Sequence, residues 1–371
     1  MARMGESSFS VSTESFFDGY SLHGPTRISV VDGAVVDITP HDGPCDHHLV
    51  SPGLVDLQLN GWSDVDFSSA SRDDIVRIDG ELASLGTTSY LATLVTDSLG
   101  RMQDRAGLLA RIIPGLGGMV GIHLEGPFLG RAPGAHRRDR IIDLDAEWLR
   151  GLPAVVRLVT VGAEQNGLAA VVEGLVSAGV AVSIGHSLPS ETEYESAVAA
   201  GARMCTHLFN AMSGVHHRDF GLALAALTDE RVVAGLISDM HHVSPRAVSL
   251  AFRARPDGII LVSDSVAWGS EGARARSVEL RDGAPRLPDG TLAGSSTCLA
   301  ECVRLAVTEA GVDLAHALRA ATTVPSSFIG MPDRGVIING SPADLVAYSD
   351  DLRVVRTWRR LVSSRGTPTD D

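Results

Sequence analysis

The chain has 371 residues, which is enough for one large barrel or for two to three ordinary domains. A hydrophobic content of 44% with 39 glycines and 17 prolines fits a compact α/β protein with many short turns. The formal net charge of −14 argues against a surface that binds nucleic acid or an anionic membrane. The chain contains no lysine, so Schiff-base chemistry on a lysine is excluded.

The cysteines and the N-terminus bear on the cellular compartment. None of the 4 cysteines forms a Cys-x-x-Cys pair, and the first residues have no apolar signal-peptide core. No apolar stretch reaches ~18 residues, the length that crosses a bilayer. We therefore expect reduced thiols in a cytoplasmic protein that partners neither membranes nor nucleic acid.

Short strands with hairpin turns are predicted at both ends of the chain. Residues 8–50 contain alternating apolar runs with a turn signal at Asp32-Gly33, and residues 335–362 repeat the pattern. The economical arrangement is a small β-sandwich domain that both termini form together. We assign residues 1–51 and 335–371 to it, with the rest of the chain inserted between them.

The inserted part, residues 52–334, alternates short β-branched runs with longer amphipathic, Ala-rich segments. Its helix signals include Ser190, which precedes three nearby glutamates, and Gly201, which closes the same segment. Eight strands separated by helical patterns predict a (β/α)8 barrel within the α/β class. The predicted strands are 53–59, 87–95, 119–124, 155–162, 180–185, 202–207, 232–238 and 259–263.

Four of these runs end on a residue that can hold a metal or move a proton: Glu125, His186, His207 and Asp264. In a barrel of parallel strands such ends converge on one face, so residues far apart in sequence share a site. One carboxylate and two imidazoles leave an open position on a catalytic divalent metal, which water or substrate must occupy. Asp264 beside that metal would accept a proton and return it to a leaving group.

Each residue taken alone has a simpler explanation. A single histidine at a strand end is more often a hydrogen-bonded structural residue than a ligand, and Asp264 could cap the helix that follows. The combination of three such strand ends, each beside a small residue or proline, favours the metal site. His123 shares a strand face with Glu125 and is interpreted as a core or supporting histidine.

Several stretches in chain order resemble the N-acetylglucosamine-6-phosphate deacetylases of the amidohydrolase superfamily. The similarity runs from about residue 52 to residue 350, and the combination of HLEGP with THLFNAM is its most specific part. The matching stretches are PGLVDLQLNG (52–61), GIHLEGPFL (121–129), IGHS (184–187), THLFNAMSGVHHR (206–218), LVSD (261–264) and GTLAGSS (290–296).

The resemblance implies a reaction and a metal site. The reaction is hydrolysis of the acetamide of N-acetylglucosamine 6-phosphate to glucosamine 6-phosphate and acetate. The implied metal ligands are Glu125, His186 and His207, and the implied catalytic carboxylate is Asp264. Many amidohydrolases carry a His-x-His pair on the first strand for a second metal, whereas this chain has Gln58-Leu59-Asn60. Amides coordinate divalent metals weakly, so we expect one metal per subunit, Zn²⁺ first and Fe²⁺ as the alternative.

Other matched positions concern the substrate. His136 matches a histidine that polarises the carbonyl, and Arg131 stands in a loop that is often lysine-rich in the family. The implied arginine contact to phosphate comes from a neighbouring subunit, so a homodimer is expected with Arg218 in that role. An exposed loop histidine and a solvated charge cluster are the simpler readings of His136 and Arg218. The expected substrate-binding residues are His136, Asn210, Ala211, Arg218, His242, Leu292, Ala293 and Gly294.

The chain departs from the family pattern around the expected pocket. The departures are Ser265-Val266 after the catalytic aspartate, Met240 before the histidine pair 241–242, Trp62 after the first strand, and a segment 268–290 that looks shortened. Three alternatives therefore stay open. They are a deacetylase of a related amino-sugar phosphate such as the galactosamine epimer, an amidohydrolase of another substrate class, and an inactive sugar-phosphate-binding protein.

Overall fold

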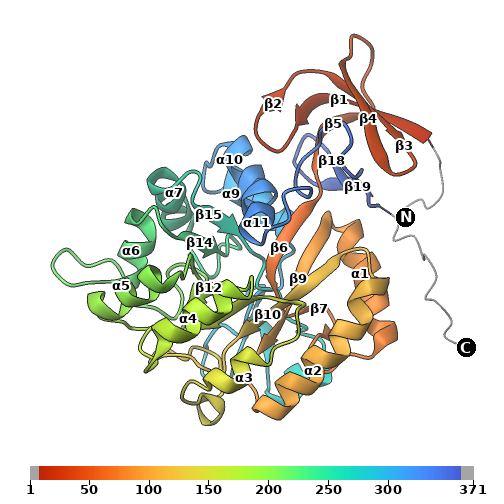
Figure 1. Ribbon diagram of the computed structural model, residues 1–371. Coiled ribbons are helices and arrows are strands. Elements are labelled where there is room, and N and C mark those ends of the chain that lie inside the picture. Colours follow the sequence, from red (N-terminus) through yellow and green to blue (C-terminus); the bar gives the residue numbers. More distant parts are fainter. Residues whose placement is uncertain (1–7, 361–371) are drawn as a thin grey trace, which may run out of the picture.

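The computed structural model describes residues 8–360. At its centre lies an eight-stranded parallel sheet in the order β15-β14-β13-β12-β11-β10-β9-β6 (Figure 1). The predicted and observed strand ends differ by at most two residues. The observed strands are β6 (Leu54–Leu59), β9 (Thr87–Val95), β10 (Met119–Glu125), β11 (Val156–Val161), β12 (Ala181–Ile184), β13 (Met204–Cys205), β14 (Val233–Leu236) and β15 (Ile259–Leu261).

The two edges of this sheet meet and close it into a barrel. Leu59 at the end of β6 forms a parallel bridge with Ser265, and the Asp264 N–H donates to the Gln58 carbonyl at 2.9 Å. Strands of a closed parallel sheet are covered on both faces, which explains why β6 consists entirely of buried residues. The barrel fold class predicted from the sequence is confirmed.

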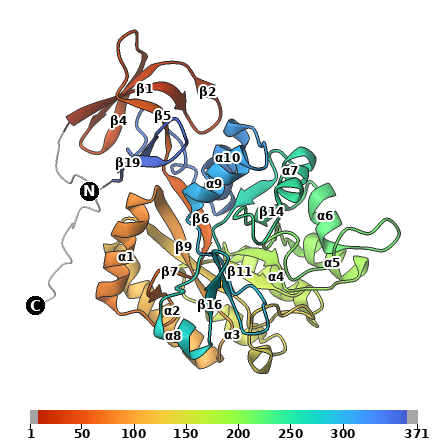
Figure 2. The same ribbon diagram turned by 180° about the vertical axis from the view of Figure 1, so that it is seen from behind.

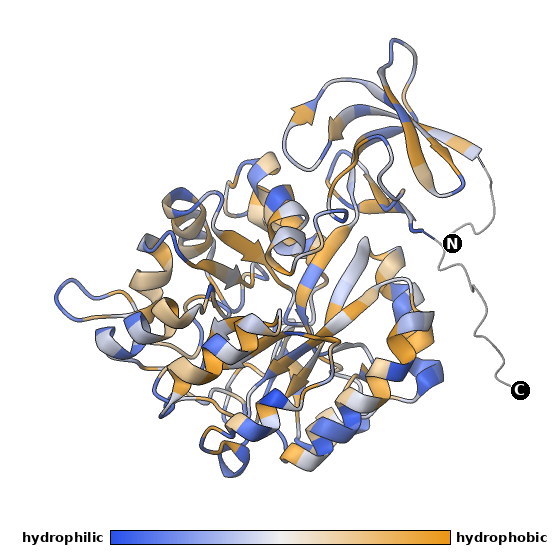
Figure 3. Ribbon diagram, in the orientation of Figure 1, coloured by the Kyte–Doolittle hydropathy of each residue, from blue (hydrophilic) through white to orange (hydrophobic). Residues whose placement is uncertain are grey.

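Helices surround the barrel and turn their apolar sides toward it (Figure 3). The α5 helix begins and ends where the sequence predicted, because Ser190 and Glu193 form a capping box and Gly201 adopts a φ of +118°. The helices are α1 (Arg72–Ser84), α2 (Leu99–Ile112), α3 (Ala146–Arg150), α4 (Leu168–Ser177), α5 (Glu191–Ala200), α6 (Leu222–Thr228), α7 (Pro245–Ala254), α8 (Glu271–Ala275), α9 (Leu299–Thr308), α10 (Leu314–Ala320) and α11 (Thr323–Phe328), with 3-10 turns η1 (Ile113–Gly115) and η2 (Arg138–Arg140).

A second apolar cluster fills the barrel interior below the strand ends. Its side chains include Leu91, Leu158 and Ile260, and Phe328 of α11 packs against it. Side chains two apart on a strand share a face, so Leu91 and Leu158 lie on the same face as the polar Thr93 and Thr160 above them. This packing gives the strand ends a rigid base.

Strands from both ends of the chain form one seven-stranded sheet beside the barrel (Figure 1). The joint is the antiparallel pair β5–β18, in which Val50 faces Ala347. This sheet has its own apolar core, which includes Ile28, Val35 and Leu345. Its strands are β1 (Ser8–Phe17), β2 (Leu22–His23), β3 (Thr26–Val31), β4 (Ala34–Pro40), β5 (His47–Pro52), β18 (Leu345–Tyr348) and β19 (Val354–Trp358).

The domain limits stay predictions, and residues 1–7 and 361–371 of the two terminal parts lie outside the described residues. Two small hairpins complete the fold: β7 (Gly61–Trp62) with β8 (Val65–Asp66), and β16 (Glu279–Arg281) with β17 (Ala284–Arg286). The second hairpin and α8 lie together on the side of the barrel seen in Figure 2. Within the part of the chain that the structure describes, no helix is long and apolar enough to cross a membrane.

Candidate active site

A cavity of about 480 Å³ opens at the carboxyl ends of the barrel strands. Glu125, His186, His207 and Asp264 all line it, so the four strand-end residues share one site as the sequence predicted. Catalytic groups of barrel enzymes lie at this face of the fold. Polar groups that converge in the large cavity of a protein make it the first candidate for an active site.

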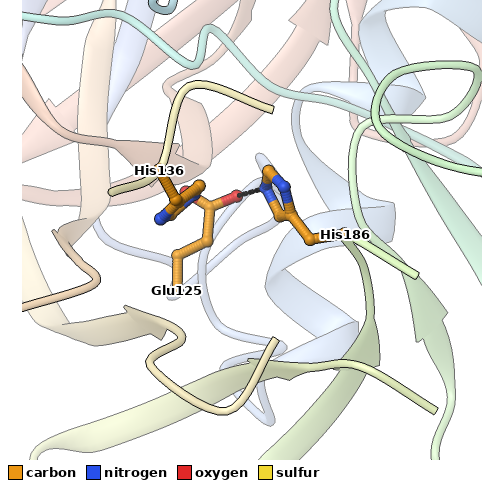
Figure 4. A group of neighbouring side chains, drawn as sticks. All are labelled: Glu125, His136 and His186. Carbon is orange, nitrogen blue, oxygen red and sulfur yellow. Dashed lines mark hydrogen bonds and ion pairs between the residues drawn. The ribbon is translucent and has the colours of Figure 1, made fainter. Parts of the chain in front are cut away.

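Glu125, His186 and His207 meet at the floor of the cavity. The Glu125 Oε1 atom lies 3.2 Å from Nε2 of His186 and 3.2 Å from Nε2 of His207, and the two Nε2 atoms are 2.9 Å apart. Their side chains are almost completely buried. Potential ligand atoms of Glu125, His136 and His186 also lie within 4.8 Å of one another (Figure 4).

The hydrogen bonds of these residues leave lone pairs that can face a bound cation. His186 Nδ1 lies 3.1 Å from the Ala132 carbonyl, which can only accept, so neutral His186 carries its proton there and a lone pair on Nε2. Glu125 Oε1 is also an acceptor, and the Gln58 amide reaches it at 3.0 Å. The two neutral imidazoles add at most one further N–H at this point, from His207. Two imidazole nitrogens and one carboxylate are a usual ligand set for a catalytic divalent metal. The residues therefore fit the metal that the sequence predicted.

The backbone at three of the four strand ends is strained. His186, His207 and Asp264 have φ values of +51°, +33° and +47°, in the left-handed region that non-glycine residues seldom adopt. Gly185 lets β12 approach its neighbours at this point, because a Cβ there would lie 2.7 Å from a Thr160 methyl group. Such strain concentrates at functional sites, where the surrounding structure holds the side chains in place.

Asp264 sits beside this group with one of its oxygens held by two amides. Its Oδ1 accepts hydrogen bonds from Gln58 Nε2 at 3.1 Å and Asn60 Nδ2 at 2.8 Å. Burial, together with the charge of Glu125, raises the pKa of Asp264 to about 6, although His207, His242 and Asn60 oppose the rise. A pKa in this range suits a group that takes up and releases a proton near neutral pH.

The neighbouring groups have different protonation preferences. Burial alone would raise the pKa of Glu125, but the neighbouring imidazoles of His186 and His207 hold it well below its usual range. Burial works to lower the pKa of His207, and the contact with Glu125 outweighs it, so that pKa is raised. Burial and the nearby His186 lower the pKa of His136 to about 3, which keeps this imidazole neutral.

His136 reaches the site from the loop after β10. Its Nδ1 lies 2.9 Å from Thr96 Oγ1, its Nε2 lies 3.8 Å from Glu125 Oε2, and its ring centroid is 4.3 Å from that of His186. The single hydroxyl proton of Thr96 can go to His136 Nδ1 or to the Glu125 carbonyl at 3.2 Å. When Thr96 donates to Nδ1, neutral His136 carries its proton on Nε2 and can donate into the cavity.

The amidohydrolase family profile matches residues 49–361, which is most of the chain. The chain belongs to the amidohydrolase family. It is 34% identical to an N-acetylglucosamine-6-phosphate deacetylase of Bos taurus, over 92% of this chain and 88% of the relative. It is also 34% identical to an N-acetylgalactosamine-6-phosphate deacetylase of a Shewanella species, over 82% of this chain and 80% of the relative.

A solved structure gives the same family relationship in three dimensions. A mutant N-acetyl-D-glucosamine-6-phosphate deacetylase of Mycobacterium smegmatis, in complex with N-acetyl-D-glucosamine 6-phosphate, matches this amidohydrolase with a TM-score of 0.88 and 29% identity. The match covers 96% of this chain and 99% of that one. The resemblance inferred from the motifs is thereby confirmed.

Most of the predicted substrate-binding residues of this amidohydrolase line the cavity. Besides His136 they are Asn210, Ala211, His242, Leu292, Ala293 and Gly294. Of the adjacent pair 241–242, it is His242 that reaches the cavity. Its Nδ1 lies 2.7 Å from Asp239 Oδ2, which fixes the ring. The binding roles themselves stay predictions.

The two arginines that the sequence singled out lie elsewhere. Arg218 is exposed on the loop between β13 and α6, and within this chain it does not line the cavity. Arg131 bonds Glu164 and the Leu188 carbonyl and is likewise absent from the cavity wall. The arginines that do line it are Arg137 and Arg276.

Three features of the site were missed in the sequence. Thr96 directly follows β9 and could have been found by searching for polar residues at strand ends, as for Glu125. Arg276, in the turn after α8, reaches the loop of His136 by donating to the Ala135 carbonyl at 2.7 Å, and no pattern in the sequence marks that contact. Gln58 and Asn60 were noted in the sequence only because they stand in place of a His-x-His pair, and their contacts were not predicted.

The departures from the family pattern have local explanations. Ser265 is buried and its hydroxyl donates to the Gly61 carbonyl at 2.6 Å, while Val266 lines the cavity. Trp62 packs edge-on against Trp268 with ring centroids 5.0 Å apart. Residues of the segment 268–290, among them Ser270, Ala273 and Val278, form part of the cavity wall. Met240 adopts a φ of +65° in the turn that positions His242.

Proposed function

We propose that this amidohydrolase removes the acetyl group of N-acetylglucosamine 6-phosphate, giving glucosamine 6-phosphate and acetate. The observation that supports the proposal most is the meeting of Glu125, His186 and His207 beside Asp264 in one cavity. The relatives with this activity support the choice of substrate. An inactive binding protein would have no need for a carboxylate whose pKa is raised to about 6 beside three metal ligands.

Glu125, His186 and His207 would hold one divalent metal, for which we propose Zn²⁺, with Fe²⁺ as the alternative. When bound, the metal supplies a Lewis acid that polarises the amide carbonyl and makes water more acidic. Glu125 keeps its negative charge for this role because its pKa is well below the usual range. His186 offers its Nε2 lone pair because Nδ1 donates to Ala132.

Asp264 would carry the proton in both halves of the reaction. It first takes a proton from the water that attacks the acetamide carbonyl. It then gives this proton to the nitrogen as the C–N bond breaks, so the sugar leaves as an amine. Its Oδ1 is occupied by the amides of Gln58 and Asn60, so the proton is expected on Oδ2.

His136 would polarise the carbonyl by donating from Nε2 to the oxygen as negative charge develops there. This role needs the tautomer in which Nδ1 accepts from Thr96, so the threonine hydroxyl decides which histidine nitrogen bears the proton. A neutral histidine suits the role, because its pKa is lowered to about 3.

The sugar phosphate would lie between Asn210, Ala211 and His242 on one side and the 292–294 strip on the other. Arg218 is proposed to contact the phosphate of a partner subunit, and this proposal requires a homodimer. Its exposed position on the loop between β13 and α6 is consistent with reaching outside its own chain. We place the reaction in the cytoplasm, where the cysteines, all free in the structure, would stay reduced.

A second substrate is N-acetylgalactosamine 6-phosphate. The Shewanella relative with that activity is as similar to this chain, at 34% identity, as the Bos taurus glucosamine relative. The two sugars differ at one hydroxyl, and every proposed catalytic residue serves both. The wall formed by Val266 and the segment 268–290 is where the choice between them would be made.

The proposal is tested by acetate release from a panel of N-acetylated sugars, each with and without the 6-phosphate. The panel contains the gluco and galacto epimers, and the protein is assayed after chelation and after adding back Zn²⁺ or Fe²⁺. We expect turnover of a 6-phosphate only, abolished by chelation and restored by metal. Turnover of unphosphorylated sugars alone would contradict the phosphate site, and full activity after verified metal removal would contradict the metal site.

A further inference from the structure

Two buried amides on the first barrel strand connect the metal site to the catalytic carboxylate. Gln58 Nε2 lies 3.0 Å from Glu125 Oε1 and 3.1 Å from Asp264 Oδ1. Asn60 Nδ2 lies 2.8 Å from Asp264 Oδ1. Gln58 is 1% exposed and Asn60 is 9% exposed, so water does not compete strongly for these contacts.

The chemistry of the partners fixes which way each amide faces. Ionised carboxylate oxygens only accept hydrogen bonds, so the NH₂ groups of Gln58 and Asn60 must face them. The carbonyl oxygens, Gln58 Oε1 and Asn60 Oδ1, are buried and have no hydrogen-bond partner among the described residues. Leaving such oxygens unpaired costs free energy, which indicates that the orientation toward the carboxylates is maintained against a local cost.

We propose that Gln58 and Asn60 are positioning residues, with Gln58 bracing both the ligand Glu125 and the base Asp264, and Asn60 bracing Asp264 alone. The inference rests on the proposed function and deepens it, because it assigns a role to two buried amides that contact the proposed ligand Glu125 and the proposed base Asp264. An N–H donor aimed at Glu125 Oε1 and Asp264 Oδ1 also repels a second cation from the space between them.

The two residues should act in different ways because their contacts differ. Losing the Gln58 N–H leaves Glu125 and Asp264 each short of a donor, so metal affinity and turnover both fall. Losing the Asn60 N–H affects Asp264 only. Oδ1 then keeps the Gln58 donor alone, so Oδ2, which has no hydrogen-bond partner among the described residues, loses part of its advantage as the proton carrier. Groups that orient metal ligands from behind typically contribute about 10- to 100-fold in metal affinity or activity.

The experiment compares Gln58→Leu and Asn60→Leu, which replace each amide by an apolar branched side chain and remove the donors. Cobalt affinity is measured by competition with a chelator, and the visible absorption of the cobalt-loaded protein is recorded without substrate. Turnover is then measured with N-acetylglucosamine 6-phosphate. We expect Gln58→Leu to weaken cobalt binding about tenfold, alter the spectrum and lower kcat about 10- to 100-fold.

Asn60→Leu is the matched comparison on the same strand. We expect it to lower kcat about tenfold, with KM, cobalt affinity and spectrum close to those of the parent protein. Equal effects of the two variants on cobalt affinity, or unchanged cobalt affinity in Gln58→Leu, would overturn the assignment. The cobalt measurements need no substrate. If N-acetylglucosamine 6-phosphate is not the substrate, the turnover measurement alone fails and the cobalt comparison still tests the positioning role.

Gln58→Asn and Asn60→Gln serve as a second pair if the leucine variants fold poorly. Each keeps an amide and changes only its reach by one methylene. The shortened Gln58→Asn cannot span Glu125 and Asp264 together, so cobalt affinity should still fall. Asn60→Gln should keep parental cobalt affinity and recover part of the kcat lost in Asn60→Leu. A Gln58→Asn protein with parental affinity and kcat would contradict the bracing role.

Discussion

Two buried carboxylates in the same cavity, Glu125 and Asp264, have opposite protonation preferences because their neighbours differ. Glu125 faces two imidazoles, which keep its pKa low. Asp264 faces neutral amides and the charge of Glu125, and burial is the main reason that its pKa is raised to about 6. One carboxylate therefore suits a cation and the other suits a proton, which is how a single site can divide ligand and base roles.

Asp264→Asn tests the second role directly. Asparagine has nearly the same shape and cannot accept the proton from water, so we expect kcat to fall by about 10³-fold or more while the metal is retained. Metal content by elemental analysis and steady-state kinetics check the two parts. Near-normal turnover in a metal-loaded Asp264→Asn protein would rule out the assignment of the base.

Thr96→Val tests the link between Thr96 and His136. The variant is almost isosteric and removes the only side-chain partner of His136 Nδ1 among the described residues. Without that partner the tautomer with a proton on Nε2 loses its preference, so we expect about a tenfold drop in kcat with unchanged metal content. A parental kcat would show that the hydroxyl does not orient His136 for catalysis.

At the scale of elements, the closure between β6 and β15 depends on another buried carboxylate, Asp56. Its Oδ1 accepts from the backbone N–H of Gln58 at 3.2 Å and of Ser263 at 3.3 Å, while Oδ2 has no partner among the described residues. Burial raises the pKa of Asp56 to about 7, the Asp264 charge adds to the rise, and the hydrogen bonds oppose it. Asp56 is thus protonated in the folded protein over a pH range where the unfolded chain is ionised.

This difference gives Asp56 a predictable effect on stability. The folded state binds the proton more tightly, so the stabilisation is complete below about pH 4 and is lost as pH rises to about 7, a change of roughly 4 kcal/mol at most. Asp56→Asn cannot titrate, so its urea unfolding midpoint should fall less steeply between pH 4 and 7. Asp264, whose pKa is also raised, makes the unfolding midpoint depend on pH in both proteins. Identical slopes would show that Asp56 is ionised in the folded state.

The elements themselves were largely predictable from the sequence. Strands buried on both faces, such as β6 and β9, are rich in apolar and β-branched residues, and this composition is visible without any structure. The strand-end rule then found Glu125, His186, His207 and Asp264. The rule could not find what depends on side-chain direction across strands, such as the Gln58 amide that faces Glu125. It also missed Arg276, because α8 is a short segment without apolar periodicity.

For the molecule as a whole, the terminal sheet is tied to the barrel by a buried ion pair. Arg359 Nη2, just after β19, lies 2.6 Å from Asp79 Oδ2 on α1. Asp79 also accepts from the backbone N–H of Gly118 at 3.0 Å and from the Tyr90 hydroxyl at 3.2 Å. The last described strand, β19, is thus anchored to the first barrel helix, and neither charged residue lines the cavity.

Arg359→Ala should separate the stability of the whole molecule from the chemistry of the site. The variant leaves Asp79 buried at 5% exposure without its counter-charge, so we expect the free energy of unfolding to fall by about 3 kcal/mol, measured by urea titration. Arg353→Ala removes an exposed pair with Asp351 just before β19 and should leave the unfolding midpoint almost unchanged. Below the unfolding transition, kcat and KM of Arg359→Ala should match those of the parent, because the cavity wall keeps all its residues. A loss of turnover at full folding would instead show that the terminal sheet controls the geometry of the active site.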